Sequence, residues 1–309
     1  MRVASLLPSA TETLFALGVE PVGVSHSCDH PPAVHGLLTL TSTVVDHEGR
    51  SAGEVDAQMR SVEGAVYDLA VDRLADLEAD LVVTQATCDV CAVDASEVRA
   101  AVASLDPEPE LVTLDPHSFA DVLGDVERLG AAVEKRAAAA AVSSRLSARV
   151  DRLRKRATDA VADAGRPRTA VLDWTDPPIR AGHWVRDMVD IAGGDPSFQP
   201  AGASEPVAWA DVCAYDPEVL VVVPCGFELD RAVEAVADLR GRPGWSDLTA
   251  VANDRVYAVD GNALVNRPSH RLVASLEAVF GCVHPEHAET TTAGRRVERI
   301  DGRRSVDPR

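Results

Sequence analysis

Hydrophobic residues form short, β-branched runs that alternate along the chain with segments of helical spacing. The clearest runs lie at 3–7, 81–84, 169–172 and 219–223. Each is followed by apolar positions three and four residues apart, the spacing of an amphipathic helix. Short buried strands that alternate with helices are typical of parallel α/β layers. The pattern therefore predicts an α/β fold with parallel, Rossmann-like sheets.

The middle of the chain breaks this alternation. Between residues 118 and 164 there is no proline, and the glycines there are Gly124 and Gly130. Leucines and valines recur close to every 3.6 residues, which predicts a helix near 118–132 and a long helix near 134–164. The second would span about 45 Å. An isolated coiled coil is the alternative, but a single apolar stripe between two α/β halves favours a connecting helix.

The α/β pattern restarts after this helix, so we expect two lobes, each with a core of its own. Apolar content falls near the carboxyl terminus, where threonine, glycine and arginine dominate. The expected organisation is an amino-terminal lobe at 1–117, connecting helices at 118–165, a carboxyl-terminal lobe at 166–285 and a loosely ordered tail at 286–309.

The charge balance is strongly acidic. The chain has 30 basic and 49 acidic residues, a formal net charge of −19, and its lysines are Lys135 and Lys155. This composition is typical of proteins from organisms with high internal salt, where salt screens the repulsion between carboxylates. An ordinary acidic cytosolic protein is the alternative. Nucleic acid is a poor partner in either case, because phosphate binding needs a basic patch.

The sequence offers no obvious membrane or export signal. No apolar run approaches the roughly 18 residues of a membrane-spanning helix. The apolar segment at 3–7 is shorter than the core of a secretory signal, and no lipoprotein cysteine follows it. We therefore expect a cytoplasmic location.

Residues whose side chains could bind a ligand or a metal lie where the expected strands end. In parallel α/β sheets, ligands bind at the carboxyl ends of the strands. The segments that follow the expected strands are rich in tryptophan, histidine, cysteine, asparagine and proline. These segments are 7–12, 25–32, 85–92, 174–184, 224–227 and 261–268.

Several of these segments together resemble a known family. They are Arg2–Glu12, Cys28–Pro32, Thr84–Ala92, Ala181–Trp184, Pro224–Phe227 and Asn266–Pro268. They resemble the helical-backbone, class III substrate-binding proteins of ABC importers for cobalamin and iron-siderophores. The resemblance is strongest to a cobalamin-binding-protein-like subgroup that lacks a signal peptide, and it covers residues 2–285. It implies two lobes joined by one long backbone helix, with the ligand held in a cleft between the lobes.

The resemblance implies a corrinoid ligand, cobalamin or a precursor, that is handled inside the cell or in connection with transport. An extracytoplasmic component of a cobalamin or iron-siderophore importer is the alternative. A flat, apolar macrocycle with amide arms needs aromatic walls and a few hydrogen-bonding groups. Trp174, Trp184 and Tyr67 are candidate walls, although each could be a packing residue. The full set of candidate ligand-binding residues is Pro8, Ser9, Tyr67, Gln85, Trp174, His183, Trp184, Phe227, Asn262 and Arg267. Arg267 could anchor a polar arm of the ligand or form a salt bridge between the lobes.

The cysteines suggest a second hypothesis. We expect all six to be thiols, ligands or reactive groups rather than a disulfide framework. Cys28, Cys88, Cys91 and Cys225 all lie in loops at strand ends. Together they could bind zinc, iron, an iron–sulfur cluster or the cobalt of a corrinoid, as in a metalloprotein or metalloenzyme. Their spacing matches no compact zinc motif, and small thiols that pack without meeting are the alternative.

Two carboxylates are candidates for docking on a permease, and the sequence carries few signatures of catalysis. Importer proteins of the resembled family dock through one exposed carboxylate on each lobe, and Glu12 and Glu205 are the candidates for an ABC permease partner. Glu12 also stands three residues after Ser9, the spacing of a helix capping box, which explains it without a partner. The sequence has no dinucleotide fingerprint, phosphate loop or nucleophile elbow. We therefore expect a binding protein and not an enzyme.

Overall fold

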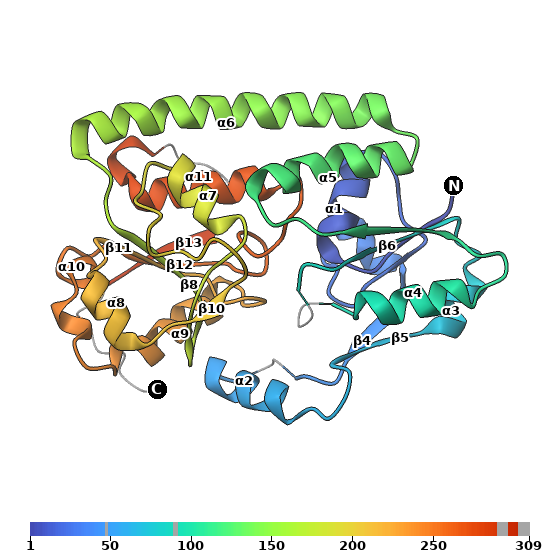
Figure 1. The fold of residues 1–309 in the computed structure, drawn as a ribbon, viewed down its shortest axis with the longest axis horizontal. Helices are drawn as coiled ribbons and strands as arrows, with labels where there is room; N and C mark the ends of the chain where they lie inside the picture. Colours follow the sequence, from blue (N-terminus) through green and yellow to red (C-terminus); the bar gives the residue numbers. More distant parts are fainter. Residues whose placement is uncertain (47–48, 89–91, 289–295, 302–309) are drawn as a thin grey trace. The chain divides into compact units, whose positions relative to one another are not determined.

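The computed structural model describes residues 1–46, 49–88, 92–288 and 296–301. The chain divides into two compact units. Unit 1 comprises Met1–Arg50, Val55–Pro116 and Ala120–Leu146, and unit 2 comprises Ser51–Glu54, His117–Phe119 and Ser147–Arg309. The 29-residue helix α6 (Arg136–Ala164) contributes residues to both units (Figure 1). The expected α/β fold with a long connecting helix is confirmed, although the connecting helices are shared between the units and do not form a separate segment.

Unit 1 contains a five-stranded parallel sheet in the order β3-β2-β1-β6-β7 and a separate two-stranded antiparallel sheet. The strands are β1 (Val3–Ser5), β2 (Gly23–Val24), β3 (Leu38–Thr39), β4 (Thr41–Thr43), β5 (Tyr67–Leu69), β6 (Leu81–Gln85) and β7 (Glu110–Leu114). The helices outside α6 are α1 (Pro8–Ala16), η1 (Pro32–Gly36), α2 (Ala52–Ser61), α3 (Val71–Asp76), α4 (Ala95–Ala103) and α5 (Phe119–Ala132). The first residues of α2 and α5 are counted with unit 2.

Unit 2 contains a six-stranded mixed sheet in the order β10-β9-β8-β11-β12-β13, in which β8, β11 and β12 are parallel. The strands are β8 (Thr169–Thr175), β9 (Pro178–Arg180), β10 (Glu205–Pro206), β11 (Val219–Val222), β12 (Val256–Val259) and β13 (Val297–Ile300). The helices are α7 (Val185–Ile191), α8 (Trp209–Tyr215), α9 (Leu229–Arg240), η2 (Trp245–Asp247), α10 (Thr249–Ala252), α11 (Leu272–Val283) and η3 (Pro285–His287). Helices α7 and α11 cover one face of this sheet, and α8 and α9 cover the other (Figure 1).

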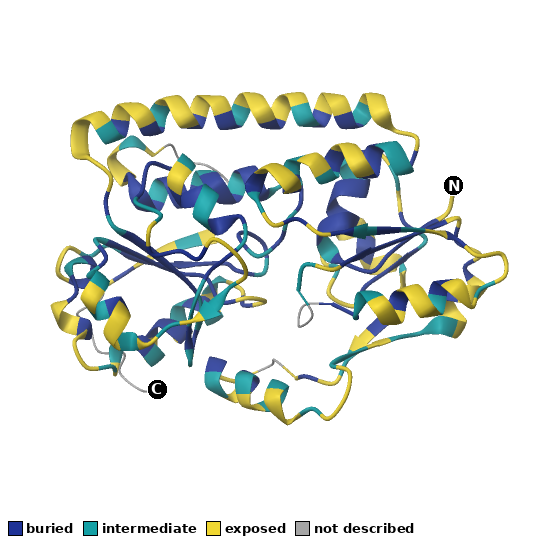
Figure 2. Ribbon diagram, viewed as in Figure 1, coloured by how far each residue is buried: buried dark blue, intermediate teal, exposed yellow. Residues whose placement is uncertain are grey.

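The burial pattern explains why these segments adopt their structures. All four residues of β11 and of β12 are buried, because helices cover both faces of the sheet (Figure 2). Helix α6 buries one stripe, which includes Leu146, Val150 and Leu153, and exposes its other side. The backbones of α5 and α6 approach closely at Gly130, where an added Cβ would collide with the Cβ of Ala139.

Two local expectations are wrong. Helix α1 begins at Pro8, its N-cap is Leu7, and no side chain caps it, so Ser9 and Glu12 form no capping box. With proline at the first helical position the N-cap lies two residues earlier, at Leu7 instead of Ser9, because proline has no N–H that would need a partner. The expected loosely ordered tail also contains β13, which pairs antiparallel with β12 and buries Ile300 in the core of unit 2.

In the described ranges, no helix combines the length and the apolar character that crossing a membrane requires.

Candidate functional site

Trp174 lies near the carboxyl end of β8 and is half-buried. Its ring meets that of Phe227 edge to face, with centroids 5.2 Å apart, and its Nε1 donates to the carbonyl oxygen of Asp176 at 3.1 Å. Phe227 is only 2% exposed, and the guanidinium of Arg231 lies 3.6 Å from its ring centroid. Phe227 therefore packs against Trp174, and of the two rings only that of Trp174 is accessible enough to contact a ligand.

Trp184 and His183 follow β9. Trp184 is 7% exposed, and its Nε1 donates to the carbonyl oxygen of Val265 at 2.7 Å. His183 is half-buried, has a φ of +52°, and stacks on Trp184 with centroids 5.5 Å apart. The indole of Trp184 thus anchors its own loop, and its contact with a ligand stays a prediction.

Two glycines hold these loops together. At Gly182, an added Cβ would lie closer than 3.0 Å to the main chain of 202–204, and at Gly261 it would collide with the carbonyl of Pro224. The side chain of Asn266 donates from Nδ2 to the carbonyl oxygen of Val223 at 2.9 Å. Gly182 and Gly261 therefore allow close main-chain packing between the loops at the ends of β8, β11 and β12.

A polar cluster that the sequence analysis missed lies among these loops. Ser204 Oγ donates to Asp173 Oδ2 and accepts from the amide of Gly182 at 3.0 Å. The amide of Cys225 donates to the carbonyl oxygen of Asp173 at 3.1 Å. Desolvation raises the pKa of the Asp173 carboxyl to about 6, and the hydrogen bond from Ser204 opposes this rise. Asp173 and Ser204 are 31 residues apart, so no local motif could have shown that they meet.

Arg267 and Asn262 complete this part of unit 2. Arg267 is 8% exposed, and its Nη2 donates to Asn262 Oδ1 at 2.8 Å. The amide of Asn262 donates to the carbonyl oxygen of Phe227 at 3.0 Å. The two side chains contact each other, and their contact with a ligand stays a prediction.

In unit 1, Tyr67 is half-buried and stacks on His26, with centroids 5.7 Å apart. His26 Nδ1 lies 2.7 Å from the hydroxyl of Thr41. Gln85 closes the loop after β6: its Oε1 accepts from the amide of Cys88 at 2.9 Å, and its Nε2 donates to the carbonyl oxygen of Cys88 at 2.6 Å. The amide group of Gln85 therefore shapes its loop.

The other two candidates of unit 1 start helix α1. Pro8 is half-buried, and Ser9 is 4% exposed, with its carbonyl oxygen accepting from Thr13 Oγ1 at 2.9 Å. Contact of either residue with a ligand stays a prediction.

The cysteines differ from one another. Cys88 is disulfide-bonded, so the expectation that all six cysteines are thiols, ligands or reactive groups is wrong for this residue, whereas Cys28 is a thiol whose Sγ lies 3.2 Å from the hydroxyl oxygen of Thr11. Desolvation, followed by the Asp173 carboxyl, raises the pKa of the Cys225 thiol to about 12, which keeps this thiol neutral. Cys91 lies outside the described residues. Within the described part of the chain, no three metal-ligating side chains come together, so the four-cysteine metal site stays a prediction without support.

The proposed docking carboxylates have different surroundings. Glu12 is 1% exposed, so it cannot present an accessible carboxylate, and this part of the permease prediction is wrong for the structure as described. The residue sits in the first turns of α1, where its neighbours on the helix are also buried. Glu205 is partly exposed and forms an ion pair with Arg180.

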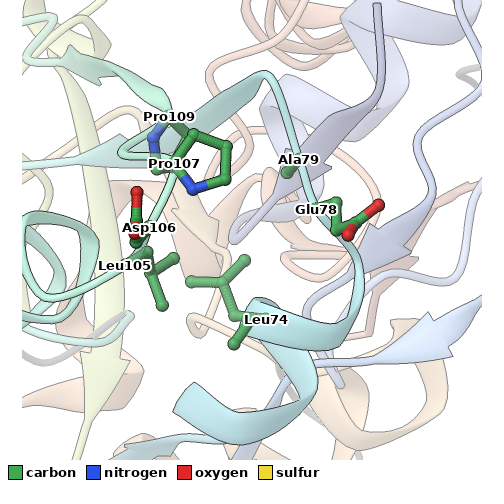
Figure 3. A pocket seen from close by; sticks show the side chains of 8 residues that line it. Leu74, Glu78, Ala79, Leu105, Asp106, Pro107 and Pro109 are labelled. Carbon is green, nitrogen blue, oxygen red and sulfur yellow. The ribbon is translucent and has the colours of Figure 1, made fainter.

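Unit 1 also contains a hollow (Figure 3). It is lined by Leu74, Ala75, Glu78, Ala79, Leu105, Asp106, Pro107 and Pro109. Ala79 precedes β6 and Pro109 precedes β7, so the hollow lies at the amino edge of the sheet. The carboxyl edge, where α/β proteins bind their ligands, is the opposite one. We therefore do not include the hollow in the candidate site.

Comparison with known proteins gives a consistent result. Residues 3–263 match the family model described as periplasmic binding protein. No curated protein matches significantly. Many solved structures are similar in fold, and the three described next are each less than 25% identical to this chain.

The first is a periplasmic heme binding protein from Pseudomonas aeruginosa, with a TM-score of 0.72, 18% identity and coverage of 96% of both chains. The second is a possible iron-binding periplasmic solute-binding protein from Staphylococcus epidermidis, with a TM-score of 0.69, 21% identity and coverage of 92% of this chain and 98% of the other. The third is the periplasmic vitamin B12 binding protein of Vibrio cholerae, with a TM-score of 0.62, 19% identity and coverage of 91% and 96%.

Proposed function

Since the chain belongs to the periplasmic binding protein family, whose members bind substrates and are not enzymes, we propose that it is a binding protein for a corrinoid, cobalamin or a precursor. Solved proteins of similar fold are named for heme, for iron and for vitamin B12, so the family alone leaves the ligand open. The choice of a corrinoid depends on the chemistry of the candidate residues.

The observation that carries this proposal is the set of side chains at the carboxyl ends of β8 and β11. Trp174 offers a half-buried aromatic face that is supported by Phe227. Asp173 precedes Trp174 in β8, and Ser204, which lies just before β10, donates a hydrogen bond to Asp173, so this region also offers polar atoms. A flat, apolar ring with polar arms around its edge requires this combination of one aromatic surface with polar groups beside it.

Titration with cobalamin, cobinamide and haem tests the proposal. The ligand absorbance and the tryptophan fluorescence of the protein report binding, and high salt screens the effect of the −19 net charge. We expect saturable binding of at least one corrinoid that is tighter than the binding of haem. An absence of any spectral change with corrinoids up to roughly 100 μM would refute the proposal.

A matched pair of tryptophan variants then locates the ligand. Trp174 and Trp209 are both half-buried, and each donates from Nε1 to a backbone carbonyl, that of Asp176 or that of Pro243. Trp174→Ala should weaken corrinoid binding by about 1–3 kcal/mol, because a large aromatic contact is lost. Trp209→Ala should leave the affinity unchanged. Equal affinities in the two variants would remove Trp174 from the ligand site.

The biological setting forms part of the proposal. We propose intracellular or transport-related handling of the corrinoid, with an importer component as the alternative, and Glu205 as the remaining candidate for contact with a permease. Cell fractionation with an antibody against the protein tests the compartment. A signal confined to the cytosolic fraction supports handling inside the cell, and a surface signal favours the importer.

A further inference from the structure

Asp173 is an unusual carboxylate in unit 2, and its surroundings indicate a task beyond packing. It is half-buried at the end of β8, among the loops that carry the candidate ligand residues. In the described part of the chain, the structure records no ion pair for it, and Ser204 is the side chain that hydrogen-bonds to it. Most buried carboxylates in proteins are paired, because an unpaired charge is costly to desolvate. For Asp173 no opposite charge among the described residues offsets the cost of desolvation, and the raised pKa of its carboxyl reflects that cost.

Its orientation is fixed by several independent contacts. Ser204 Oγ donates to Asp173 Oδ2, and the amide of Gly182 donates in turn to Ser204 Oγ at 3.0 Å. The amide of Cys225 holds the main chain of Asp173 at 3.1 Å. Residues 202–204 pass so close to Gly182 that no side chain could stand there. The carboxylate is thus held by main-chain geometry and does not rotate freely.

A carboxylate of this kind accepts hydrogen bonds and donates none. Its two oxygens offer about four lone-pair positions, and the Ser204 hydroxyl and the backbone amide of Asp173 itself already donate to the carboxylate. The remaining positions suit an N–H donor, while a second carboxylate nearby would be repelled in a site of reduced dielectric constant. Burial raises the pKa of the neighbouring Cys225 thiol, and Arg267 acts on that thiol by lowering its pKa. The pKa of the Asp173 carboxyl, in contrast, responds only to desolvation and hydrogen bonds, so no positive charge in the described part of the chain reverses the preference at Asp173.

We propose that Asp173, positioned by Ser204, is a specificity-determining residue that accepts a hydrogen bond from an amide arm of the ligand and discriminates against carboxylate arms. This inference rests on the proposed corrinoid function and makes it more specific. Corrinoids carry amide arms around the ring, whereas haem carries propionates. The same residue would therefore favour a fully amidated corrinoid over haem and over corrinoids whose arms are still carboxylic acids.

Two probes with the same ring test this inference on the full chain. Dicyanocobinamide carries amide arms, and dicyanocobyrinic acid carries carboxylates in their place. Dissociation constants are measured for both by absorbance at pH 8, where the Asp173 carboxyl is ionised, and in about 1 M KCl to screen distant charges. The quantity of interest is the ratio of the two constants, acid over amide. We expect a ratio of about tenfold or more in the wild type, because hydrogen bonds to charged groups and the repulsion between carboxylates both contribute.

The variants separate recognition from structure. Asp173→Asn should reduce the ratio about tenfold, since it removes the charge and keeps the shape. Asp230→Asn, which removes one charge from an exposed position of unit 2, should leave the ratio unchanged. Ser204→Ala should lower the ratio by releasing the carboxylate. An unchanged ratio in that variant would remove Ser204 from the proposal.

The outcomes distinguish this inference from the proposed function. Binding of cobinamide with a wild-type ratio near one would overturn the inference and leave corrinoid binding intact. Equal weakening of both probes in Asp173→Asn would show a structural role only, and would also overturn it. If neither probe binds the wild type, the proposed function and the inference fail together.

Discussion

Gly261 provides a direct test of how the binding loops of unit 2 are built. An added Cβ would lie closer than 3.0 Å to the carbonyl group of Pro224 and 2.9 Å from Asn266 Nδ2. The carbonyl oxygen belongs to the main chain and cannot rotate away, so the loop at 224–227 would have to move by roughly an ångström. Gly261→Ala should therefore cost about 1–3 kcal/mol, the usual cost of overpacking a well-packed region. It should also weaken the hydrogen bond from Asn266 to Val223.

Thermal unfolding followed by circular dichroism or calorimetry measures this cost. For a unit of this size, 2 kcal/mol lowers the Tm by about 4–8 °C. Gly241→Ala is the matched control, because Gly241 lies in unit 2, has a φ of −76° and has nothing within 4 Å of its added Cβ. It should leave the Tm unchanged or raise it slightly, since alanine lowers the entropy of the unfolded chain. A Gly261→Ala protein as stable as the wild type, or equal losses in both variants, would refute the claim that close main-chain contact fixes these loops.

Two further predictions concern charged groups. Desolvation raises the pKa of Asp125 to about 6, so the folded protein binds a proton that the unfolded chain releases near pH 4, and stability falls as the pH rises from about 4 to 6. Asp125→Asn should therefore match the wild-type free energy of unfolding in urea at pH 4 and exceed it at pH 8 by an amount on the order of 1 kcal/mol, since partial exposure screens the group. A difference in this free energy that stays constant between pH 4 and pH 8 would contradict the prediction. Arg149 binds Glu277 through two hydrogen bonds, of 3.0 and 2.9 Å, which join α6 to α11. Arg149→Met should lower the free energy of unfolding in urea by about 1 kcal/mol. Arg145→Met, at an exposed position of α6, should leave it unchanged, and equal effects of the two variants would show that the Arg149–Glu277 pair contributes nothing to stability.

Much of the fold could be predicted from the sequence, because long periodic segments are hard to misread. The long connecting helix was expected near 134–164 and spans Arg136–Ala164, since no proline or glycine interrupts its stripe. The buried run at 219–223 was expected as a strand and forms β11. Shorter strands escaped detection: β3 and β10 have two residues each, too few for any alternation to show. Their existence depends on neighbouring strands that lie far away in the sequence.

The candidate site was predictable only in part, for a related reason. Tryptophans and glycine motifs are visible in a sequence, so Trp174, Trp184 and Gly182 could be singled out. The roles of the two tryptophans could not be predicted, because burial decides them. Trp184 is 7% exposed and its Nε1 donates to the carbonyl oxygen of Val265, while Trp174 is half-buried. Asp173 could not be singled out, because one aspartate among many acidic residues carries no distinguishing sequence signal. Its significance comes from Ser204, which tertiary structure brings to it.

The different roles of the glycines, Trp174 and Asp173 follow from the chemistry of each group. Main-chain contacts at Gly182 and Gly261 fix the loops without any side chain, and this leaves the neighbouring side chains available for other roles. Aromatic groups alone would accept any flat macrocycle, because apolar contact discriminates weakly between rings of similar shape. A fixed, ionised acceptor discriminates strongly, since a ligand arm of the wrong charge leaves it unpaired or repelled. Under the proposed function, Trp174 would therefore account for the class of ligand, and Asp173 for the choice within that class.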